Sequence, residues 1–142
     1  MKKLKVTIIG YGGMGSFHAK LIQANPEVEV HGIFDISESR QQAGEADGYS
    51  AYASLEEALN DACADTILIA TPNDVHKEIA VQALEAGKHV ICEKPVTLNS
   101  EELSEIMHTA KEHERVFMVH QNRRWDSDFQ MVKDLYEKRK IG

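Results

Sequence analysis

Short apolar runs alternate with longer segments of mixed polarity along the chain. The runs lack the strict apolar–polar alternation of a strand with one solvated face, so they are typical of strands buried on both faces of a sheet. The strands predicted in this way comprise residues 5–9, 28–34, 49–52, 66–70, 89–92 and 116–119. The segment 49–52 is a short strand at best.

Between these runs, apolar residues recur at the three- and four-residue spacing of helices with one buried face. Helices are predicted over residues 14–24, 37–46 and 54–60, then from about 75 to Gly87, from Asn99 onward, and over 127–139. Ser54 and Glu57 match a capping box. The last helix is expected to bury Phe129, Val132 and Tyr136. The alternation of strand and helix predicts an α/β fold, a doubly wound and mostly parallel Rossmann sheet with helices on both faces.

Composition and charge narrow the possible partners. The 142 residues are enough for one domain, and 42% hydrophobic with 27% charged residues is ordinary for a soluble protein. The formal net charge of −7 argues against nucleic-acid binding. No apolar run approaches the ~18 residues that a membrane span requires. Cys63 and Cys92 lie far apart without a CxxC motif, which fits a reducing cytoplasm, and the histidines show no metal-ligand spacing with cysteine.

A glycine-rich stretch, Gly-Tyr-Gly-Gly-Met-Gly, follows the first predicted strand and opens the first helix. Any glycine-rich turn can match GxGxxG, but this strand–turn–helix context is typical of dinucleotide binding. Gly10 would permit a tight turn, Gly12 would let the backbone approach a pyrophosphate, and Gly15 would let helix and strand pack closely. Gly13 and Met14 begin a helix whose free amides would face the phosphates. A purely structural turn is the less favoured alternative.

Asp35 ends the second predicted strand, twenty residues after Gly15. A carboxylate there can accept hydrogen bonds from both hydroxyls of the adenosine ribose, and it would repel a 2′-phosphate. NAD is therefore favoured over NADP as the cofactor. Ser37 and Arg40 lie nearby and could instead hold a 2′-phosphate, so NADP stays possible. Asp35 could also merely cap the helix that starts near Ser37.

Three further polar segments follow strands whose carboxyl ends would share one edge of the sheet, where ligands of such folds bind. Their candidate residues are Thr71, Pro72, Asn73 and His76 after the fourth strand, Glu93 and Lys94 after the fifth, and Arg123 and Trp125 after the sixth. A lysine at this edge could exchange a proton with a substrate hydroxyl. Each segment also has a structural explanation, as a strand end, a helix cap or a packed aromatic residue, and for His76 both explanations stay open.

Taken together, these residues resemble the Gfo/Idh/MocA family of glucose–fructose oxidoreductases, inositol dehydrogenases and rhizopine-catabolism proteins. The order and spacing of the glycine loop, Asp35, Thr71-Pro72-Asn73, Glu93-Lys94-Pro95 and residues 122–126 carry the resemblance. The Glu-Lys-Pro element is the most specific part, because generic Rossmann domains lack it. The resemblance implies an oxidoreductase that transfers hydride between a secondary alcohol of a sugar or polyol and a nicotinamide cofactor.

The resemblance also implies roles and boundaries. Lys94 would be the catalytic lysine, with a bond to Pro95 that is often cis, and Glu93 would lie near the nicotinamide. The residues implied to border the cofactor are Thr71, Pro72, Asn73, His76, Arg123 and Trp125. Residues 1–125 would form the NAD(P)-binding domain, and residues 126–142 a helix leading toward a further domain. Family members are much longer, so the C-terminal substrate domain is expected to be absent here. The fragment is expected to be inactive by itself, and the full-length protein to form oligomers.

Two other functions stay open. A non-catalytic sensor or scaffold could bind a dinucleotide through the same fold, because Rossmann folds host many functions. A methyltransferase with a sulfonium cofactor also uses a glycine-rich first turn. The Glu93-Lys94-Pro95 element and the six-strand pattern argue against a methyltransferase.

Overall fold

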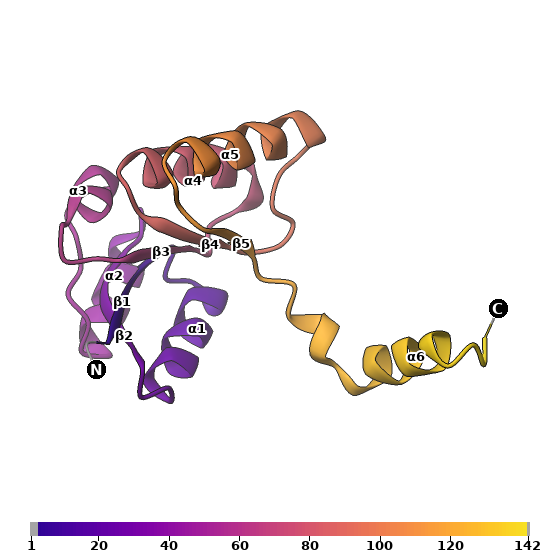
Figure 1. The fold of residues 1–142 in the computed structure, drawn as a ribbon. Coiled ribbons are helices and arrows are strands. Elements are labelled where there is room, and N and C mark those ends of the chain that lie inside the picture. The colour runs from indigo at the N-terminus through magenta and orange to yellow at the C-terminus, as the bar shows by residue number, and fades with distance from the viewer. Residues whose placement is uncertain (1–2, 142) are drawn as a thin grey trace.

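Five parallel strands form one sheet in the order β2-β1-β3-β4-β5 (Figure 1). The computed structural model describes residues 3–141. The strands are β1 (Leu4–Ile9), β2 (Val28–Phe34), β3 (Thr66–Ile69), β4 (His89–Cys92) and β5 (Phe117–Val119), and every neighbouring pair is parallel. The predicted α/β class and parallel Rossmann sheet are therefore confirmed.

The predicted strand at residues 49–52 is wrong, and the sheet has five strands instead of six. This segment meets β2 only at an isolated bridge between Ala51 and Ile33. The aromatic residues on either side of Ala51 turn toward other contacts. Tyr49 packs edge-on against Tyr11, and the Tyr52 hydroxyl donates to the Asp61 carboxylate at 2.6 Å. These contacts draw the backbone away from the strand edge after one bridge.

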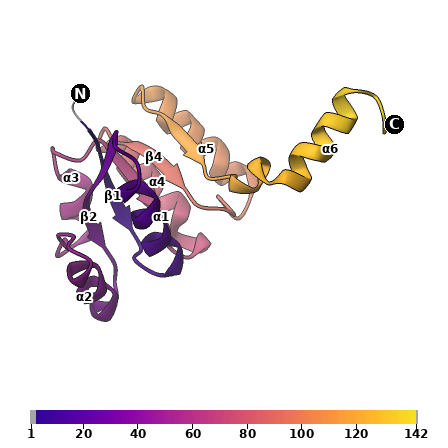
Figure 2. The same ribbon diagram turned by 90° about the horizontal axis from the view of Figure 1, so that it is seen from below.

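Helices cover both faces of the sheet (Figures 1 and 2). One layer holds α1 (Gly13–Gln23) and α2 (Glu38–Ala46), and the other holds α3 (Leu55–Asn60), α4 (His76–Glu85) and α5 (Ser100–Glu112). Alternate residues of β3 serve the two layers: Leu68 packs with the core under α1, whereas Ile67 and Ile69 pack with the core under α4 and α5. This two-sided burial explains why the strands are continuous apolar runs.

Local signals set the helix starts. The Ser54 hydroxyl accepts the Glu57 amide at 3.1 Å, and the Glu57 carboxylate accepts the Ala53 amide at 2.9 Å. The predicted Ser54–Glu57 box is confirmed, although its carboxylate reaches one residue beyond the cap. Asn99 accepts the Glu102 amide at 2.9 Å, which confirms Asn99 as the cap of α5.

The last helix, α6 (Ser127–Glu137), lies away from the sheet and its covering helices (Figures 1 and 2). It follows a short 3₁₀ turn, η2 (Asn122–Trp125). Its predicted burial is wrong, because Phe129, Val132 and Tyr136 are 46–66% exposed. Periodicity identifies the apolar face of a helix but not what covers that face. No helix among residues 3–141 combines the length and apolar character needed to cross a bilayer.

Candidate functional site

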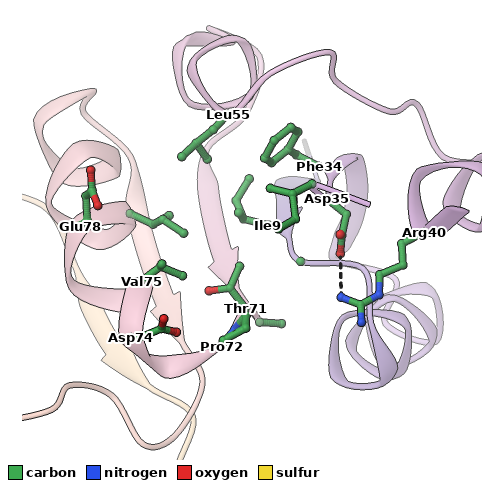
Figure 3. A pocket seen from close by; sticks show the side chains of 14 residues that line it. Ile9, Phe34, Asp35, Arg40, Leu55, Thr71, Pro72, Asp74, Val75 and Glu78 are labelled. Carbon is green, nitrogen blue, oxygen red and sulfur yellow. Dashed lines mark ion pairs between the residues drawn. The ribbon is translucent and has the colours of Figure 1, made fainter. Parts of the chain in front are cut away.

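A cavity of about 420 Å³ opens at the carboxyl ends of β1, β2 and β3 (Figure 3). Apolar side chains form much of its wall, among them Ile9, Phe34, Leu55, Val75 and Ile79. The polar groups that line it include Asp35, Arg40 and Thr71. This position matches the edge at which parallel α/β sheets bind ligands.

The glycine loop lies directly against the turn after β3. Gly10 has φ of +92°, and a side chain added there would place its Cβ 2.7 Å from the Ala70 carbonyl oxygen. A Cβ at Gly15 would collide with the Gly10 carbonyl oxygen. A Cβ at Gly13 would meet nothing within 4 Å, and one at Gly12 would face the Arg40 guanidinium at 3.7 Å. Gly10 and Gly15 therefore shape the loop, while Gly12 and Gly13 leave its outer side open.

The start of α1 offers its amides to this open side. Gly12 is the cap residue, no side chain accepts from the first turn, and that turn contains no acidic residue. Met14, in the same turn, is partly exposed. An eleven-residue helix with an uncapped amino end attracts anions through its free N–H groups and its dipole. The loop and helix therefore fit the pyrophosphate of a dinucleotide.

Asp35 lines the cavity although its side chain is only 3% exposed (Figure 3). One carboxylate oxygen accepts the Tyr11 amide and the other accepts the Ser37 amide, each at 2.8 Å. Arg40 lies 3.6 Å from the first oxygen. The carboxylate therefore holds the loop and the start of α2. Each of its oxygens can accept a further hydrogen bond, so a ligand role is compatible with this structural one.

The turn after β3 contributes Thr71 and Pro72 to the cavity wall. The Thr71 hydroxyl oxygen is buried, and it has no hydrogen-bond partner within residues 3–141. Buried polar atoms are normally paired, so this one is available to a bound molecule. Asn73 begins the 3₁₀ turn η1 (Asn73–Val75) and is half-buried.

His76 is almost fully buried at the start of α4. Its Nδ1 lies 3.0 Å from the Pro95 carbonyl oxygen and its Nε2 lies 2.9 Å from the Thr71 carbonyl oxygen. The ring thus ties the turn after β3 to the turn after β4. This is a structural role, and the predicted contact between His76 and the cofactor stays a prediction.

Glu93 follows β4 and is the centre of a buried hydrogen-bonded cluster. Its Oε1 lies 2.6 Å from His18 Nε2 and 2.9 Å from His120 Nδ1, and its Oε2 accepts the Lys94 amide at 3.1 Å. His18 comes from α1 and His120 from the end of β5, where its amide donates to the Cys92 carbonyl oxygen. The structure therefore joins three segments far apart in the sequence. We call His18, Glu93 and His120 the Glu93 cluster.

Two ionisable groups at the end of β4 have shifted pKa values. Burial opposes ionisation of Glu93, but hydrogen bonds from His18, the Lys94 amide and His120 outweigh it and lower the carboxyl pKa. Burial and the neighbouring Glu93 charge raise the pKa of the Cys92 thiol to about 12. Glu93 is therefore a carboxylate at neutral pH, and Cys92 is an inert, packed thiol.

Sequence reasoning missed the Glu93 cluster. A histidine on the buried side of the first helix is the signal that could have pointed to His18, but its partners lie more than seventy residues away in the sequence. Lys94 itself is exposed at this edge, and the Lys94–Pro95 bond is cis, as the resemblance implied. The catalytic role of Lys94 stays a prediction.

Arg123 and Trp125 are not brought to the cavity. Both lie on η2, which leads from β5 toward α6 (Figure 1). Trp125 is 77% exposed with the Arg124 guanidinium 5.9 Å from its ring, and Arg123 pairs with Asp126 at 2.9 Å. The alternative that Trp125 packs in the interior is wrong. The predicted contacts of Arg123 and Trp125 with the nicotinamide stay a prediction.

Comparison with known families decides the class of this domain. The sequence profile described as "Oxidoreductase family, NAD-binding Rossmann fold" matches residues 4–121. The chain belongs to the Gfo/Idh/MocA family. The expected family is thus confirmed, and membership of an oxidoreductase family excludes the methyltransferase alternative.

Individual relatives of this Gfo/Idh/MocA domain support the same classification. An NAD-binding protein from Listeria innocua is 54% identical with a TM-score of 0.95, over 99% of this chain and 42% of that one. GenD2 from gentamicin A biosynthesis, solved in complex with NAD, is 28% identical with a TM-score of 0.92, over 99% and 40%. The scyllo-inositol 2-dehydrogenase (NADP(+)) IolW of Bacillus subtilis is 35% identical over 93% of this chain and 37% of its own length. The chain spans about 40% of the length of curated relatives that it matches.

Proposed function

We propose that this chain is the cofactor-binding domain of an NAD-dependent dehydrogenase that acts on a secondary alcohol of a sugar or polyol. The observation that carries the proposal is the Asp35 carboxylate, which lies in the wall of the cavity beside the glycine loop. A buried carboxylate with free lone pairs is suited to the two hydroxyls of a ribose. The sugar or polyol is supported by relatives whose names are those of inositol dehydrogenases.

Each part of the cavity fits one part of the cofactor. The uncapped start of α1 would hold the pyrophosphate, and Asp35 the adenosine ribose. The apolar wall around Leu55 and Ile79 would hold the adenine, and the unpaired Thr71 hydroxyl would supply a further hydrogen bond. The other half of the cofactor would then extend toward the ends of β4 and β5, where Glu93 and Lys94 lie.

NAD is preferred over NADP in this proposal because Asp35 would repel a 2′-phosphate. Arg40 provides the opposing argument, since its guanidinium lies 3.6 Å from Asp35 and beside Gly12, and its side chain is 55% exposed. The relatives point both ways, because GenD2 was solved with NAD and the name of IolW specifies NADP. The Asp35 carboxylate is buried and holds the loop, so it moves less readily on ligand binding than the exposed Arg40 side chain. We therefore give Asp35 more weight than Arg40.

The bound nicotinamide would supply the hydride chemistry, and the protein would supply position and electrostatics. Lys94 lies at the ligand edge with its side chain exposed, so its ammonium would hold the substrate oxygen or exchange a proton with it. In the longer protein, Lys94→Ala should abolish turnover and largely preserve cofactor binding. Unchanged turnover would overturn the catalytic role of Lys94, whereas cofactor binding without any turnover in the parent would favour a non-catalytic, dinucleotide-binding module.

The proposal is tested by titrating NADH and NADPH separately into the 142-residue chain and following nicotinamide fluorescence. Saturable NADH binding, tighter than that of NADPH, is the expected result. A Lys111→Ala variant, altered at an exposed position in the last turn of α5, should bind like the parent. Absence of binding at ~1 mM NADH, corresponding to a binding free energy weaker than about −4 kcal/mol, would overturn the proposal.

A further inference from the structure

The Glu93 cluster holds two imidazole rings on one carboxylate. His18 Nε2 and His120 Nδ1 approach the same oxygen at 2.6 and 2.9 Å, and the two rings stand edge to face with centroids 4.6 Å apart. Glu93 is 5% exposed, and its second oxygen is occupied by the Lys94 amide. Both rings are therefore oriented by a buried anion that is itself fixed to the backbone of Lys94.

The charge of Glu93 determines which nitrogen of each ring carries a proton. An ionised carboxylate can only accept, so His18 donates through Nε2 and His120 donates through Nδ1. In the neutral imidazole the other nitrogen is then a lone-pair acceptor. For His18 that nitrogen is Nδ1, and for His120 it is Nε2.

Only one of the two free nitrogens belongs to a ring that reaches the surface. The His18 side chain is 6% exposed, whereas that of His120 is 23% exposed. The two nitrogens of an imidazole point in divergent directions, so Nε2 of His120 points away from Glu93. No hydrogen bond to this atom occurs within residues 3–141. Its lone pair is therefore available to a molecule bound at the edge.

His120 also lies next to the expected position of the substrate. Its amide donates to the Cys92 carbonyl oxygen at 2.8 Å, which places it beside Glu93 and Lys94 at the carboxyl ends of β4 and β5. An imidazole oriented by a carboxylate on one nitrogen and open on the other is well suited to general acid–base catalysis.

We propose that His120 is a second acid–base residue of this site and that Glu93 and His18 are its positioning residues. The inference rests on the proposed dehydrogenase function. Bound NAD⁺ would supply the hydride acceptor for the carbinol carbon, and His120 Nε2 would accept the proton released as the substrate O–H bond breaks. The products are a ketone, NADH and a His120 imidazolium, whose charge Glu93 stabilises. Lys94 keeps the role of hydrogen-bonding the substrate oxygen, and His120 returns the proton to water through its exposed edge.

The first test needs no activity. Two-dimensional ¹H–¹⁵N spectra of the imidazole rings in the 142-residue chain report which nitrogen carries the proton. At neutral pH, Nδ1 should carry the proton in His120 and Nε2 should carry it in His18. Protonation of His120 at Nε2 with a bare Nδ1 would overturn it, because the ring would then have no base to offer.

The second test asks whether a ligand covers His120. Diethyl pyrocarbonate modifies accessible unprotonated imidazole nitrogens, and mass spectrometry locates each modified histidine. Saturating NAD⁺ with a polyol should slow modification of His120 several-fold and leave His108 and His113, exposed on and after α5, unchanged. Equal rates at His120 with and without NAD⁺ and the polyol would contradict a position beside the reacting atoms.

The third test uses the longer protein. In His120→Asn the amide nitrogen can still donate to Glu93, but the outward base is lost. Turnover should fall about 10²- to 10⁴-fold, the usual contribution of a general base, with NADH affinity unchanged. His113→Asn is the matched control and should have parental activity. If the parent binds NADH but His120→Asn turns over normally, only this inference fails; if the parent does not bind NADH, the proposed function fails first.

Discussion

The two ends of the carboxyl edge of the sheet are built on different principles. The glycine-loop end, formed by residues 10–15 with Asp35 and Thr71, consists of backbone amides, apolar walls and one carboxylate. The Glu93 end, formed by the Glu93 cluster with Lys94, consists of ionisable side chains that hold one another in place. The first arrangement can bind a large ligand firmly without reacting with it. The second can hold or move protons.

The two ends also differ in the kind of substitution that each can tolerate. At the glycine-loop end, contacts between backbone atoms leave no room for a side chain at Gly10 or Gly15. At the Glu93 end, three separate elements meet through hydrogen bonds to one buried charge. A steric change should therefore damage the first end most, and a change of charge the second.

The largest effect is expected from Gly15→Ala. Its new Cβ would collide with the Gly10 carbonyl oxygen, so the loop must move, at a cost of about 3 kcal/mol or more of unfolding free energy. Urea denaturation measures this loss, and NADH binding should vanish with it. Gly13→Ala is the matched control, because its Cβ meets nothing within 4 Å and its stability should be unchanged or raised by up to about 1 kcal/mol. Equal stability of the two variants would show that the loop is not sterically constrained.

The next effect is expected from Glu93→Gln, which keeps the shape and removes the charge. At pH 7 the variant should be less stable by about 1–3 kcal/mol, the usual cost of mismatched buried polar partners. The folded pKa of Glu93 is lowered below its ordinary value of 4.5, so its stabilisation is fully present above that pH and is lost as the pH falls through the folded pKa. Urea unfolding at a series of pH values should show the two proteins converging in acid. A constant difference across that range would mean that the Glu93 charge does not stabilise the fold.

The third effect, similar in free energy to that of Glu93→Gln, is expected from Asp35→Ala on cofactor affinity. Loss of charge-assisted hydrogen bonds worth about 1.5–3 kcal/mol should weaken NADH binding about 10- to 100-fold. The preference for NADH over NADPH should shrink at the same time, because the carboxylate no longer repels a 2′-phosphate. Asp128→Ala removes a carboxylate from α6 and should bind as the parent does. Unchanged selectivity would mean that Arg40, and not Asp35, determines the choice between NADH and NADPH.

The smallest effect concerns thiol reactivity beside the Glu93 end. Cys63 is exposed, whereas Cys92 is buried with a pKa raised to about 12. Iodoacetamide at pH 8 should label Cys63 alone in the native chain. Rapid labelling of Cys92 would show that the end of β4 opens readily, and it would weaken the picture of a tightly held Glu93 cluster.

Local patterns predicted most of the fold, because buried strands and helix caps depend on neighbours in the sequence. The bounds of β2 and β4 and the cap at Asn99 were foreseen in this way. The failures involve partners distant in the sequence. Residues 49–52 leave the sheet because their tyrosines find contacts elsewhere, and α6 has an apolar face but nothing packed upon it within residues 3–141.

The same distinction applies to the site. The glycine loop and Asp35 form a local motif with fixed spacing, so the sequence alone could predict the glycine-loop end. The Glu93 end requires His18 from α1 and His120 from β5 to meet Glu93, and only the sheet order brings these elements together. The environment of His76 could not be foreseen either, because both of its partners are backbone carbonyls in other turns.

The most direct test of the account is a crystal structure of the chain with bound NAD⁺. The pyrophosphate should lie on the first turn of α1, the adenosine ribose hydroxyls within hydrogen-bond distance of Asp35, and the nicotinamide beside Glu93 and His120. A dinucleotide bound elsewhere, or a ribose turned away from Asp35, would contradict it.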